Sequence, residues 1–155
     1  MKLKTILLGI FLGVCIWIIF PYLVIKLNQF LGLPVLHFWP LQVLGWFLII
    51  SGVTIIGHLT LLFNVFGQGT PVPIEPAKKI VLESLYQRTR NPMYFCHLII
   101  FLGEFLAFGS VLLIVYLALF WLAANLIVIL WEEPGLKKRF GKEYADYCRR
   151  LPRWL

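Results

Sequence analysis

Four long apolar runs, separated by polar or proline-containing segments, dominate the chain. They cover residues 5–25, 41–63, 93–108 and 111–131. A helix of about 20 residues crosses the hydrocarbon core of a bilayer. Three of the runs reach that length, whereas the third covers only about 24 Å as a helix. The pattern predicts an all-α, polytopic membrane protein with four transmembrane helices.

The first run resembles a secretory signal peptide, because two lysines precede it. It is too long for a typical signal, however, and no small-x-small cleavage site follows it. We therefore interpret it as a retained helix, which Pro21 is expected to kink or to end. Gly9 and Gly13 form a single G-x-x-x-G, which is more readily explained by chance than by helix pairing.

Residues 66–89 form the one long polar loop of the chain. Prolines at positions 71, 73 and 76 exclude a regular helix or a central strand in its middle. Toward its end, residues 78–88 are expected to form a short interfacial helix that turns Ile80, Val81, Leu85 and Tyr86 toward lipid.

The third and fourth runs are predicted to form an antiparallel hairpin. Pro92 fits the first position of a helix. Gly109 and Ser110 leave room only for a tight turn between the two runs. The open ends of this hairpin therefore lie on the same side of the membrane.

The tail after Pro134 is predicted to be an amphipathic helix on the membrane surface. Apolar and aromatic residues recur along it at spacings of four, four, three and four, which is one helical face: Leu136, Phe140, Tyr144, Tyr147 and Leu151. Opposite charges at i,i+4 mark its other faces: Arg139/Glu143, Lys142/Asp146 and Asp146/Arg150. Trp154 is expected to anchor its end at the interface.

Composition agrees with a membrane domain. The chain of 155 residues is 61% hydrophobic, against about 45–50% in soluble domains. We expect one membrane domain over residues 1–155. Its first part, residues 1–65, holds two spans, and its second part, residues 66–155, holds the loop, the hairpin and the tail.

The net charge of +7 is explained by topology. With four spans, both termini and the 66–92 loop share one side, and 13 of the 14 basic residues lie there; only Lys26 is opposite. The positive-inside rule places that side in the cytoplasm. Nucleic acid is therefore not an expected partner. Three scattered cysteines and three scattered histidines indicate neither a disulfide framework nor a metal site.

Five residues, four of them polar, share one helical face before and within the third run. They recur at spacings of four, three, four and three: Arg90, Tyr94, His97, Phe101 and Glu104. That face should point into the bundle, because exposing its charges to lipid would be costly. We expect His97 to be functional. We expect Glu104 to lie near the outer interface, snorkelling or protonated. His58, in the second run, is either functional or a neutral histidine bonded to a neighbouring helix.

Glu132 and Glu133 close the fourth run. Pro134 disfavours the α conformation in the residue before it, so the pair is expected at a helix break near the inner surface. The two carboxylates then either cap the tail helix and complement its dipole, or bind a cationic or hydroxyl-rich ligand opposite Arg90.

Four motifs in this order resemble the membrane methyltransferases of the isoprenylcysteine carboxyl methyltransferase and phospholipid N-methyltransferase group. They are residues 67–73 (GQGTPVP), residues 90–94 (RNPMY), residues 132–134 (EEP), and the tail pattern Phe140-Gly141-x-Glu143-Tyr144-x-x-Tyr147 followed by Leu151-Pro152-Arg153-Trp154. The resemblance extends from about Phe66 to Trp154, and the first two spans match only in hydropathy.

The resemblance implies S-adenosyl-L-methionine as cofactor, held between the last two spans, the loop and the tail. It implies a lipid-like or hydrophobic methyl acceptor. The expected cofactor-binding residues are Arg90, Asn91, Pro92, Tyr94, His97, Glu132, Glu133 and Tyr144. Among these, Arg90, Glu133 and His97 are the expected catalytic residues. Related sequences commonly have glycine where Cys96 stands, so this cysteine could crowd the cofactor.

Two other functions fit the sequence. One is a non-catalytic four-helix scaffold, in which the polar residues serve only assembly. The other is a sterol-reductase-like lipid enzyme, for which the chain is short. The sequence leaves open whether oxygen, nitrogen or sulfur is methylated. A monomer and a homo-oligomer are both compatible with it.

Overall fold

The computed structural model describes residues 3–70 and 77–154, and Lys2 and the prolines at 71, 73 and 76 lie outside these ranges. The described residues form helices and no strand, so the predicted all-α fold is confirmed. In chain order the elements are α1 (Leu3–Val14), η1 (Cys15–Ile19), α2 (Phe20–Phe30), α3 (Trp39–Gly67), η2 (Ser84–Gln87), α4 (Pro92–Phe108), α5 (Leu112–Ile127), η3 (Val128–Glu132) and α6 (Glu133–Arg150).

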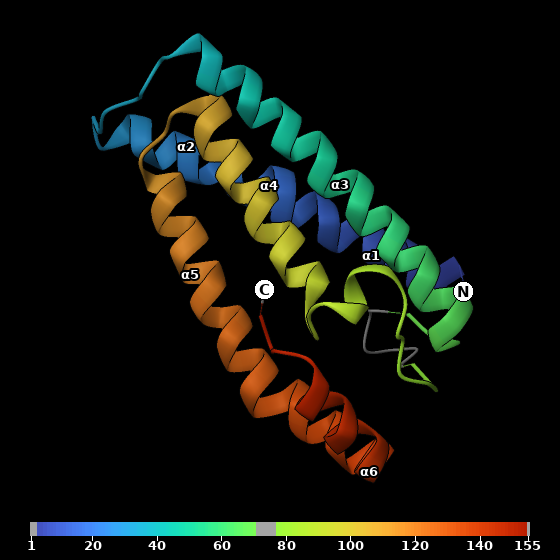
Figure 1. Ribbon diagram of the computed structural model, residues 1–155. Coiled ribbons are helices and arrows are strands. Elements are labelled where there is room, and N and C mark those ends of the chain that lie inside the picture. Colours follow the sequence, from blue (N-terminus) through green and yellow to red (C-terminus); the bar gives the residue numbers. More distant parts are fainter. Residues whose placement is uncertain (1–2, 71–76, 155) are drawn as a thin grey trace.

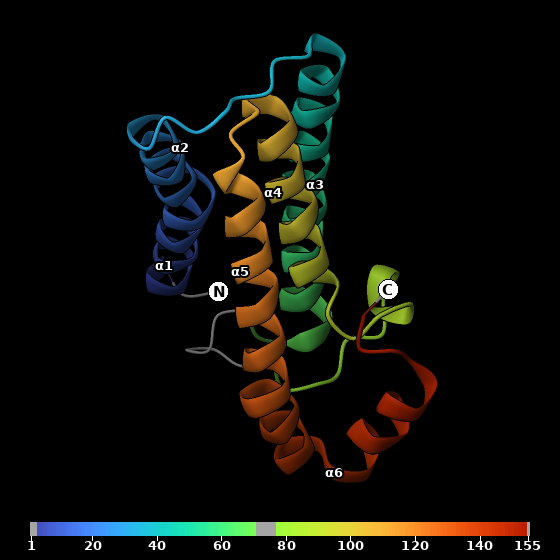
Figure 2. The same cartoon turned by 90° about the vertical axis from the view of Figure 1, so that its left-hand side faces the viewer.

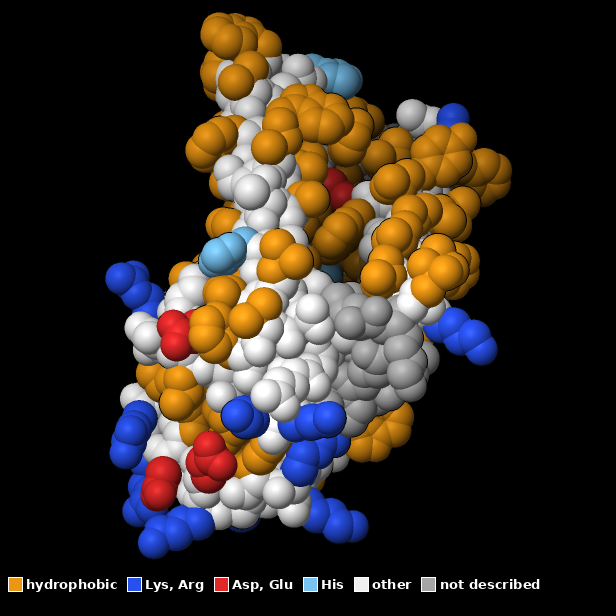
Figure 3. Space-filling view, turned by 90° about the vertical axis from the view of Figure 1, so that its right-hand side faces the viewer, with side chains coloured by type: hydrophobic (Ala, Val, Ile, Leu, Met, Phe, Trp, Pro, Cys, Tyr) orange, Lys and Arg blue, Asp and Glu red, His pale blue; other side chains and the backbone are white. Residues whose placement is uncertain are grey.

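Three of the helical segments are long and apolar enough to cross a membrane. They are Leu3–Phe30, Trp39–Gly67 and the apolar part of Leu112–Arg150, and α4 is a fourth, shorter apolar helix. Apolar side chains cover one half of the molecule, whereas Lys and Arg side chains gather at the other end (Figure 3). This distribution is that of an integral membrane protein with one charged end.

Helices α3 and α4 pack closely along their length (Figure 1). Glycines make this approach possible, because a methyl group added at Gly45 would lie 2.5 Å from the backbone nitrogen of Ala107. One added at Gly103 would lie 2.7 Å from the carbonyl oxygen of Gly45. Helices in lipid have no hydrophobic driving force to associate, so close packing at small residues holds them together. The pair α3–α4 is therefore the rigid frame from which the start of α4 projects.

Pro21 neither ends nor breaks the first helix, which continues to Phe30. Cys15–Ile19 forms a π-helical turn, in which the Phe20 N–H bonds to the Cys15 carbonyl. The next π-helical donor would be residue 21, and proline has no N–H. The Ile16 carbonyl instead accepts a hydrogen bond of 3.0 Å from the Tyr116 hydroxyl of α5. The wide turn absorbs the proline, and its spare carbonyl ties the first helix to α5.

Pro134 is accommodated in the same way, and the break predicted before it is wrong. Glu133 has helical φ and ψ angles of −61° and −45°, and its N–H bonds to Val128 across a second π turn, η3. The chain bends later, at Gly141, whose φ is +50° and ψ is −118°. Beyond this glycine the second half of α6 folds back toward the start of α4 (Figure 2).

The bend at Gly141 divides the face predicted for the tail. Tyr144 and Tyr147, after the bend, are buried, whereas Leu136 and Phe140, before it, are half-buried. The charged side chains also differ from the prediction: Asp146 pairs with Arg149, three residues away, and Arg139 donates to the Ala77 carbonyl. The tail is thus two short helical pieces, of which the second packs on the protein.

The prediction of an interfacial helix over residues 78–88 is also wrong. Only Ser84–Gln87 is helical, as one 3₁₀ turn. Val81 and Tyr86 are buried in the core rather than turned to lipid, and the Tyr86 ring lies 6.0 Å from that of Phe63 in α3. Burial raises the pKa of the Tyr86 hydroxyl above its ordinary value. The segment is a packed loop beneath the end of α3.

The tight turn between α4 and α5 is confirmed. Gly109 has a φ of +67°, and a Cβ at this position would collide with the Leu36 carbonyl. Asn28, fully buried at the end of α2, accepts from the Leu112 N–H and donates to the Leu33 carbonyl. These contacts fix the closed end of the hairpin, so its open end, with the candidate residues, lies near the charged end of the molecule.

Candidate functional site

Three segments distant in sequence meet at the open end of the hairpin: the start of α4, the start of α6 and the last described residues. The Arg90 N–H donates to the Pro152 carbonyl at 3.1 Å. The side chains of Thr89 and Asn91 both donate to the Arg153 carbonyl, at 3.0 and 3.1 Å. The C-terminal segment is therefore bonded along the backbone that precedes α4.

Glu133 lies at the centre of this meeting point. Its carboxylate receives Arg90 Nη1 at 3.0 Å, and it receives Arg153 in a bidentate manner, from Nε at 2.7 Å and Nη2 at 2.8 Å. The side chains of Arg90 and Glu133 are only 12% and 19% exposed. The hydrogen bonds to Glu133 raise the pKa of the Arg153 guanidinium further above its ordinary value. Glu133 thus pairs with two cations of the protein itself, and the ligand contact expected for it stays a prediction.

Glu132 makes a separate contact. The Tyr94 hydroxyl donates to its Oε1 at 2.5 Å. The Tyr94 ring lies 6.3 Å from Trp154 and 6.4 Å from Phe120. Because Trp154 also donates from Nε1 to Asn125 of α5 at 3.0 Å, the C-terminal segment closes over this contact.

His97 lies one turn further along α4, among aromatic rings. Its ring stacks on Phe120 at 5.5 Å, with 16° between the planes, and lies 5.5 Å from the ring of Trp17. Its Nδ1 is 2.7 Å from the Met93 carbonyl. A carbonyl can only accept, so Nδ1 carries the proton and the neutral ring keeps an unprotonated Nε2.

The second half of α6 covers the cluster from another direction. Tyr144 is 4% exposed and bonds to Cys148. Its hydroxyl also interacts electrostatically with Arg90 and Glu133. Arg90 Nη1 also approaches the Cys148 sulfur at 2.7 Å. Arg90 Nε, by contrast, is buried without a hydrogen-bond partner in the described part of the chain.

The structure brings together seven of the predicted residues in the way described, and Pro92 begins the helix that carries Tyr94 and His97. It separates three others. Glu104 is 3% exposed within the bundle, so the prediction that its carboxyl group snorkels to the outer interface is wrong. His58 is exposed on α3. Cys96, 1% exposed, belongs to the core cluster that α4 forms with α3, whereas Tyr94 and His97 point toward α5.

Sequence reasoning missed three contributors to the site. Arg153 and Trp154 stand in the quoted tail motif, yet only a contact map assigns them to Glu133 and Tyr94. Trp17 lies in a span without any motif, and nothing in its spacing distinguishes it from the other aromatic residues of the first run.

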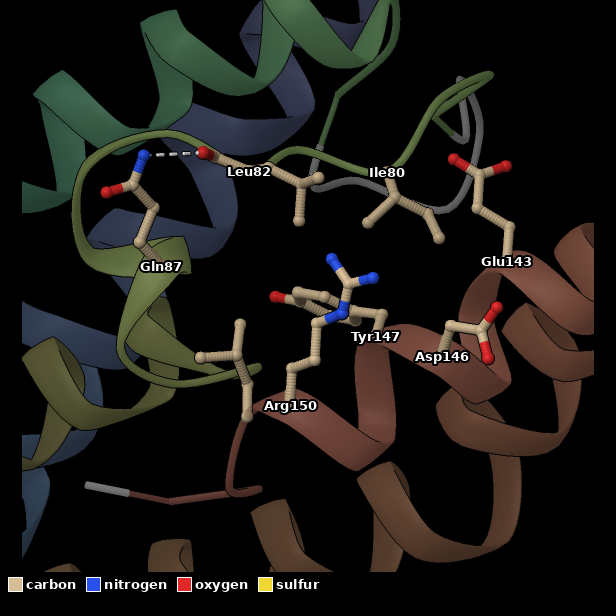
Figure 4. A pocket seen from close by; sticks show the side chains of 8 residues that line it. Ile80, Leu82, Gln87, Glu143, Asp146, Tyr147 and Arg150 are labelled. Carbon is tan, nitrogen blue, oxygen red and sulfur yellow. Dashed lines mark hydrogen bonds between the residues drawn. The ribbon is translucent and has the colours of Figure 1, made fainter.

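A cavity of about 450 Å³ lies close to the cluster but does not contain it. Side chains of the 80–87 loop face those of α6 across it (Figure 4). Its lining residues are Ile80, Leu82, Gln87, Glu143, Asp146, Tyr147, Arg150 and Leu151. Tyr147 forms its inner wall and donates its hydroxyl to the Tyr86 carbonyl at 3.1 Å. The predicted residues are therefore held against one another and do not line this cavity.

The arrangement offers two carboxylates, a guanidinium with a free donor, and several aromatic faces. This donor set suits an organic ligand that carries a carboxylate, hydroxyl groups and a cationic centre. Within residues 3–70 and 77–154, no group of three His, Cys, Asp or Glu side chains is placed to hold a metal ion.

Comparison with known proteins identifies one family. The model of the family described as phospholipid methyltransferase matches residues 36–143. This range begins after α2 and includes α3, α4, α5 and the first half of α6. No match was found among the curated proteins or among the solved structures.

Proposed function

This chain belongs to the phospholipid methyltransferase family, and on that premise we propose that it transfers the methyl group of S-adenosyl-L-methionine to a lipid-like acceptor at the cytoplasmic surface of a membrane. One observation carries the proposal. Arg90 before α4, Tyr94 in α4, and Glu132 and Glu133 at the junction of η3 and α6 form two neighbouring contacts, Arg90–Glu133 and Tyr94–Glu132, and the Tyr94 ring lies 6.4 Å from that of His97. A scaffold has no need of an imidazole beside such a set of charged groups.

The residues present fit such a cofactor. Arg90 Nε is a buried donor without a partner among the described residues, and a ligand carboxylate would satisfy it. Glu132 and Glu133 are acceptors for an ammonium group or for ribose hydroxyls. The rings of Tyr94 and Trp154 meet edge to face beside them, and aromatic faces attract a sulfonium cation. Asn91, Pro92 and Tyr144 shape the surrounding wall.

Arg153 has a second role in this proposal. Its guanidinium holds both oxygens of Glu133, which are the atoms that the cationic or hydroxyl part of the ligand needs. Binding therefore requires the C-terminal segment to release Glu133. Arg153 is the more exposed of the two arginines bound to Glu133, at 34% against 12% for Arg90, so it is the partner that a ligand cation would replace. We expect this segment to order around the bound cofactor.

When bound, S-adenosyl-L-methionine supplies an electrophilic methyl group. The chain's own residues then have two tasks, alignment and proton removal. Alignment needs rigid positioning more than strong acids or bases, and the packed start of α4 supplies it. The unprotonated Nε2 of His97 is positioned to accept the proton of an amine, thiol or hydroxyl acceptor. An ionised carboxyl acceptor would need only to be held in place.

The family suggests a phospholipid acceptor, whereas the quoted motifs also resemble enzymes that act on isoprenylated cysteine. Mass spectrometry of membrane lipids after overexpression distinguishes the two. A phospholipid acceptor gives amine-bearing lipids heavier by one methylene group, and these should be absent when His97→Gln is expressed at the same level.

Calorimetric titration of the detergent-purified protein with S-adenosyl-L-methionine tests the cofactor assignment. We expect saturable binding by the wild type and at least about ten-fold weaker binding by Glu133→Gln, because a charge-assisted contact is lost. The matched control is Glu143→Gln, which removes an exposed carboxylate of the same helix, at the neighbouring cavity. Equal affinities for wild type and Glu133→Gln would refute the site.

A further inference from the structure

Trp17 belongs to the first membrane helix, outside every motif, yet it faces the candidate site. Its ring centroid lies 5.5 Å from that of His97. Its indole Nε1 is buried and has no hydrogen-bond partner in the part of the chain that the structure describes. The indole N–H can only donate, and a buried donor left unpaired is costly. A ligand that brings an acceptor atom to this position would therefore satisfy the indole N–H.

The local backbone holds Trp17 in this position. Trp17 is the central residue of the π turn Cys15–Ile19, a type of distortion that occurs frequently at functional sites. The bond from the Tyr116 hydroxyl to the Ile16 carbonyl fixes this turn against α5. A Cβ at Gly13, one turn earlier, would lie 3.5 Å from the benzene part of the indole, which is an ordinary contact distance.

His97 consequently has two different sides. Tyr94, with Glu132, lies on the side of the motifs at 6.4 Å. Trp17 lies on the side of the first helix. The family match begins at residue 36 and so omits this helix. A cofactor common to the family is expected to contact the shared residues, which leaves the Trp17 side of His97 for the second substrate.

One face of the molecule offers access from the membrane between the first helix and α3. Figure 3 shows a hollow between two ridges of apolar side chains, formed by α3 and the α1–α2 helix, with polar side chains on its floor. A lipid-like molecule could place its chains along such a hollow and its head group near the charged end of the protein.

We propose that Trp17 is an acceptor-binding residue, whose indole N–H donates to an oxygen next to the atom that is methylated. Together with Nε2 of His97, it presents one donor and one acceptor. The pair selects a head group that combines an oxygen with a protonated nucleophile. This inference rests on the proposed function, and it makes the first helix the element that determines which acceptor is used.

Acceptor kinetics at saturating S-adenosyl-L-methionine test the proposal, with dioleoylphosphatidylethanolamine and N-acetyl-S-farnesylcysteine as probes. In Trp17→Phe an aromatic ring remains, smaller than the indole, and the N–H is lost. We expect the acceptor KM to rise about three- to ten-fold, as for one neutral hydrogen bond. The kcat and the calorimetric affinity for the cofactor should not change. Trp17→Tyr, which restores a donor, should recover part of the loss. Trp46→Phe is the matched control, because Trp46 packs edge to face on Phe108 at 5.6 Å and is 50% exposed.

A second measurement does not depend on turnover. The protein is labelled with 5-fluorotryptophan in phosphatidylcholine nanodiscs, and the Trp17 fluorine resonance is assigned by its absence in Trp17→Phe. We expect this resonance to move when one of the two probes is added. A resonance that neither probe moves, or a Trp17→Phe variant with wild-type acceptor KM, overturns the inference. If the wild type neither binds the cofactor nor methylates a probe, the proposed function fails, and the fluorine spectrum alone decides on the Trp17 site.

Discussion

At the scale of single residues, the cluster around Glu133 combines two guanidinium groups with one carboxylate. The unpaired Nε of Arg90 favours an anionic group of a ligand. The salt bridges also stabilise the fold, since Arg90 and Glu133 are largely buried and would be costly to leave unpaired. Variants of Glu133 therefore need a stability measurement beside any binding measurement.

His97 provides the sharpest prediction for turnover. His97→Gln keeps a polar side chain of similar size but removes the basic nitrogen. We expect kcat for an amine acceptor to fall by about 10²- to 10⁴-fold, the usual contribution of a general base, while cofactor affinity changes little. The measurement is methyl incorporation into phosphatidylethanolamine under saturating substrates.

The control for this change is His58→Gln, since His58 is exposed on α3 and takes no part in the cluster. The imidazole of His97 also makes the activity of the wild type depend on pH. Its Nε2 accepts a proton only while the ring is neutral, so activity should decline as acid protonates it. A variant with unchanged kcat would mean that His97 only supports packing against Phe120.

At the scale of helices, the contact between α3 and α4 is set by glycine. In Gly103→Ala the new methyl group would lie 2.7 Å from the Gly45 carbonyl oxygen and 2.9 Å from Ile49 Cγ1. Overpacking of this kind costs about 1–3 kcal/mol. We expect a lower thermal unfolding midpoint in detergent, followed by intrinsic fluorescence. Gly57→Ala on α3 is the control, because nothing lies within 4 Å of its added methyl group. An unchanged midpoint for Gly103→Ala would contradict the observed helix spacing.

The link between Pro21 and Tyr116 can be tested by a double-mutant cycle. Tyr116→Phe removes the hydroxyl that donates to the Ile16 carbonyl and should cost about 0.5–1.5 kcal/mol. In the Pro21→Ala background residue 21 regains an N–H, so the same tyrosine substitution should cost less. The measurement is chemical unfolding of the four proteins in one detergent. Additive effects would show that the hydroxyl does not compensate for the proline.

The positions of the helices followed well from the sequence, because hydropathy over 20 residues is a strong signal. Their interruptions did not. A kink or an end of the helix was expected at Pro21 and a break before Pro134, but the helix continues through both prolines, each next to a π turn. The real bend falls at Gly141, where the chain takes a left-handed conformation. The sequence shows where a proline removes a backbone hydrogen bond. The tertiary contacts determine where along the helix the backbone adjusts to this loss.

At the scale of the whole molecule, the sequence predicted which residues come together at one end but not how the cluster is closed. The hairpin argument brought Arg90 and Glu133 to one end, since two adjacent spans must return to the same side. The bend at Gly141, which returns Tyr144 and Arg153 to that end, has no hydropathy signal. Trp17 illustrates the same limit, because only the packing of the first helix on α5 reveals its neighbour His97.

The orientation of the molecule follows from its charge. The site lies at the end where basic side chains gather (Figure 3), and the positive-inside rule predicts that this end is cytoplasmic. A C-terminal fusion to green fluorescent protein should then fluoresce, while a fusion to alkaline phosphatase at the same point should be inactive. A phosphatase inserted after Leu33, in the connection between α2 and α3, should be active, because that connection lies at the opposite end. The reverse result would place the cluster away from the cytoplasm, where S-adenosyl-L-methionine is made, and the proposed chemistry could not operate.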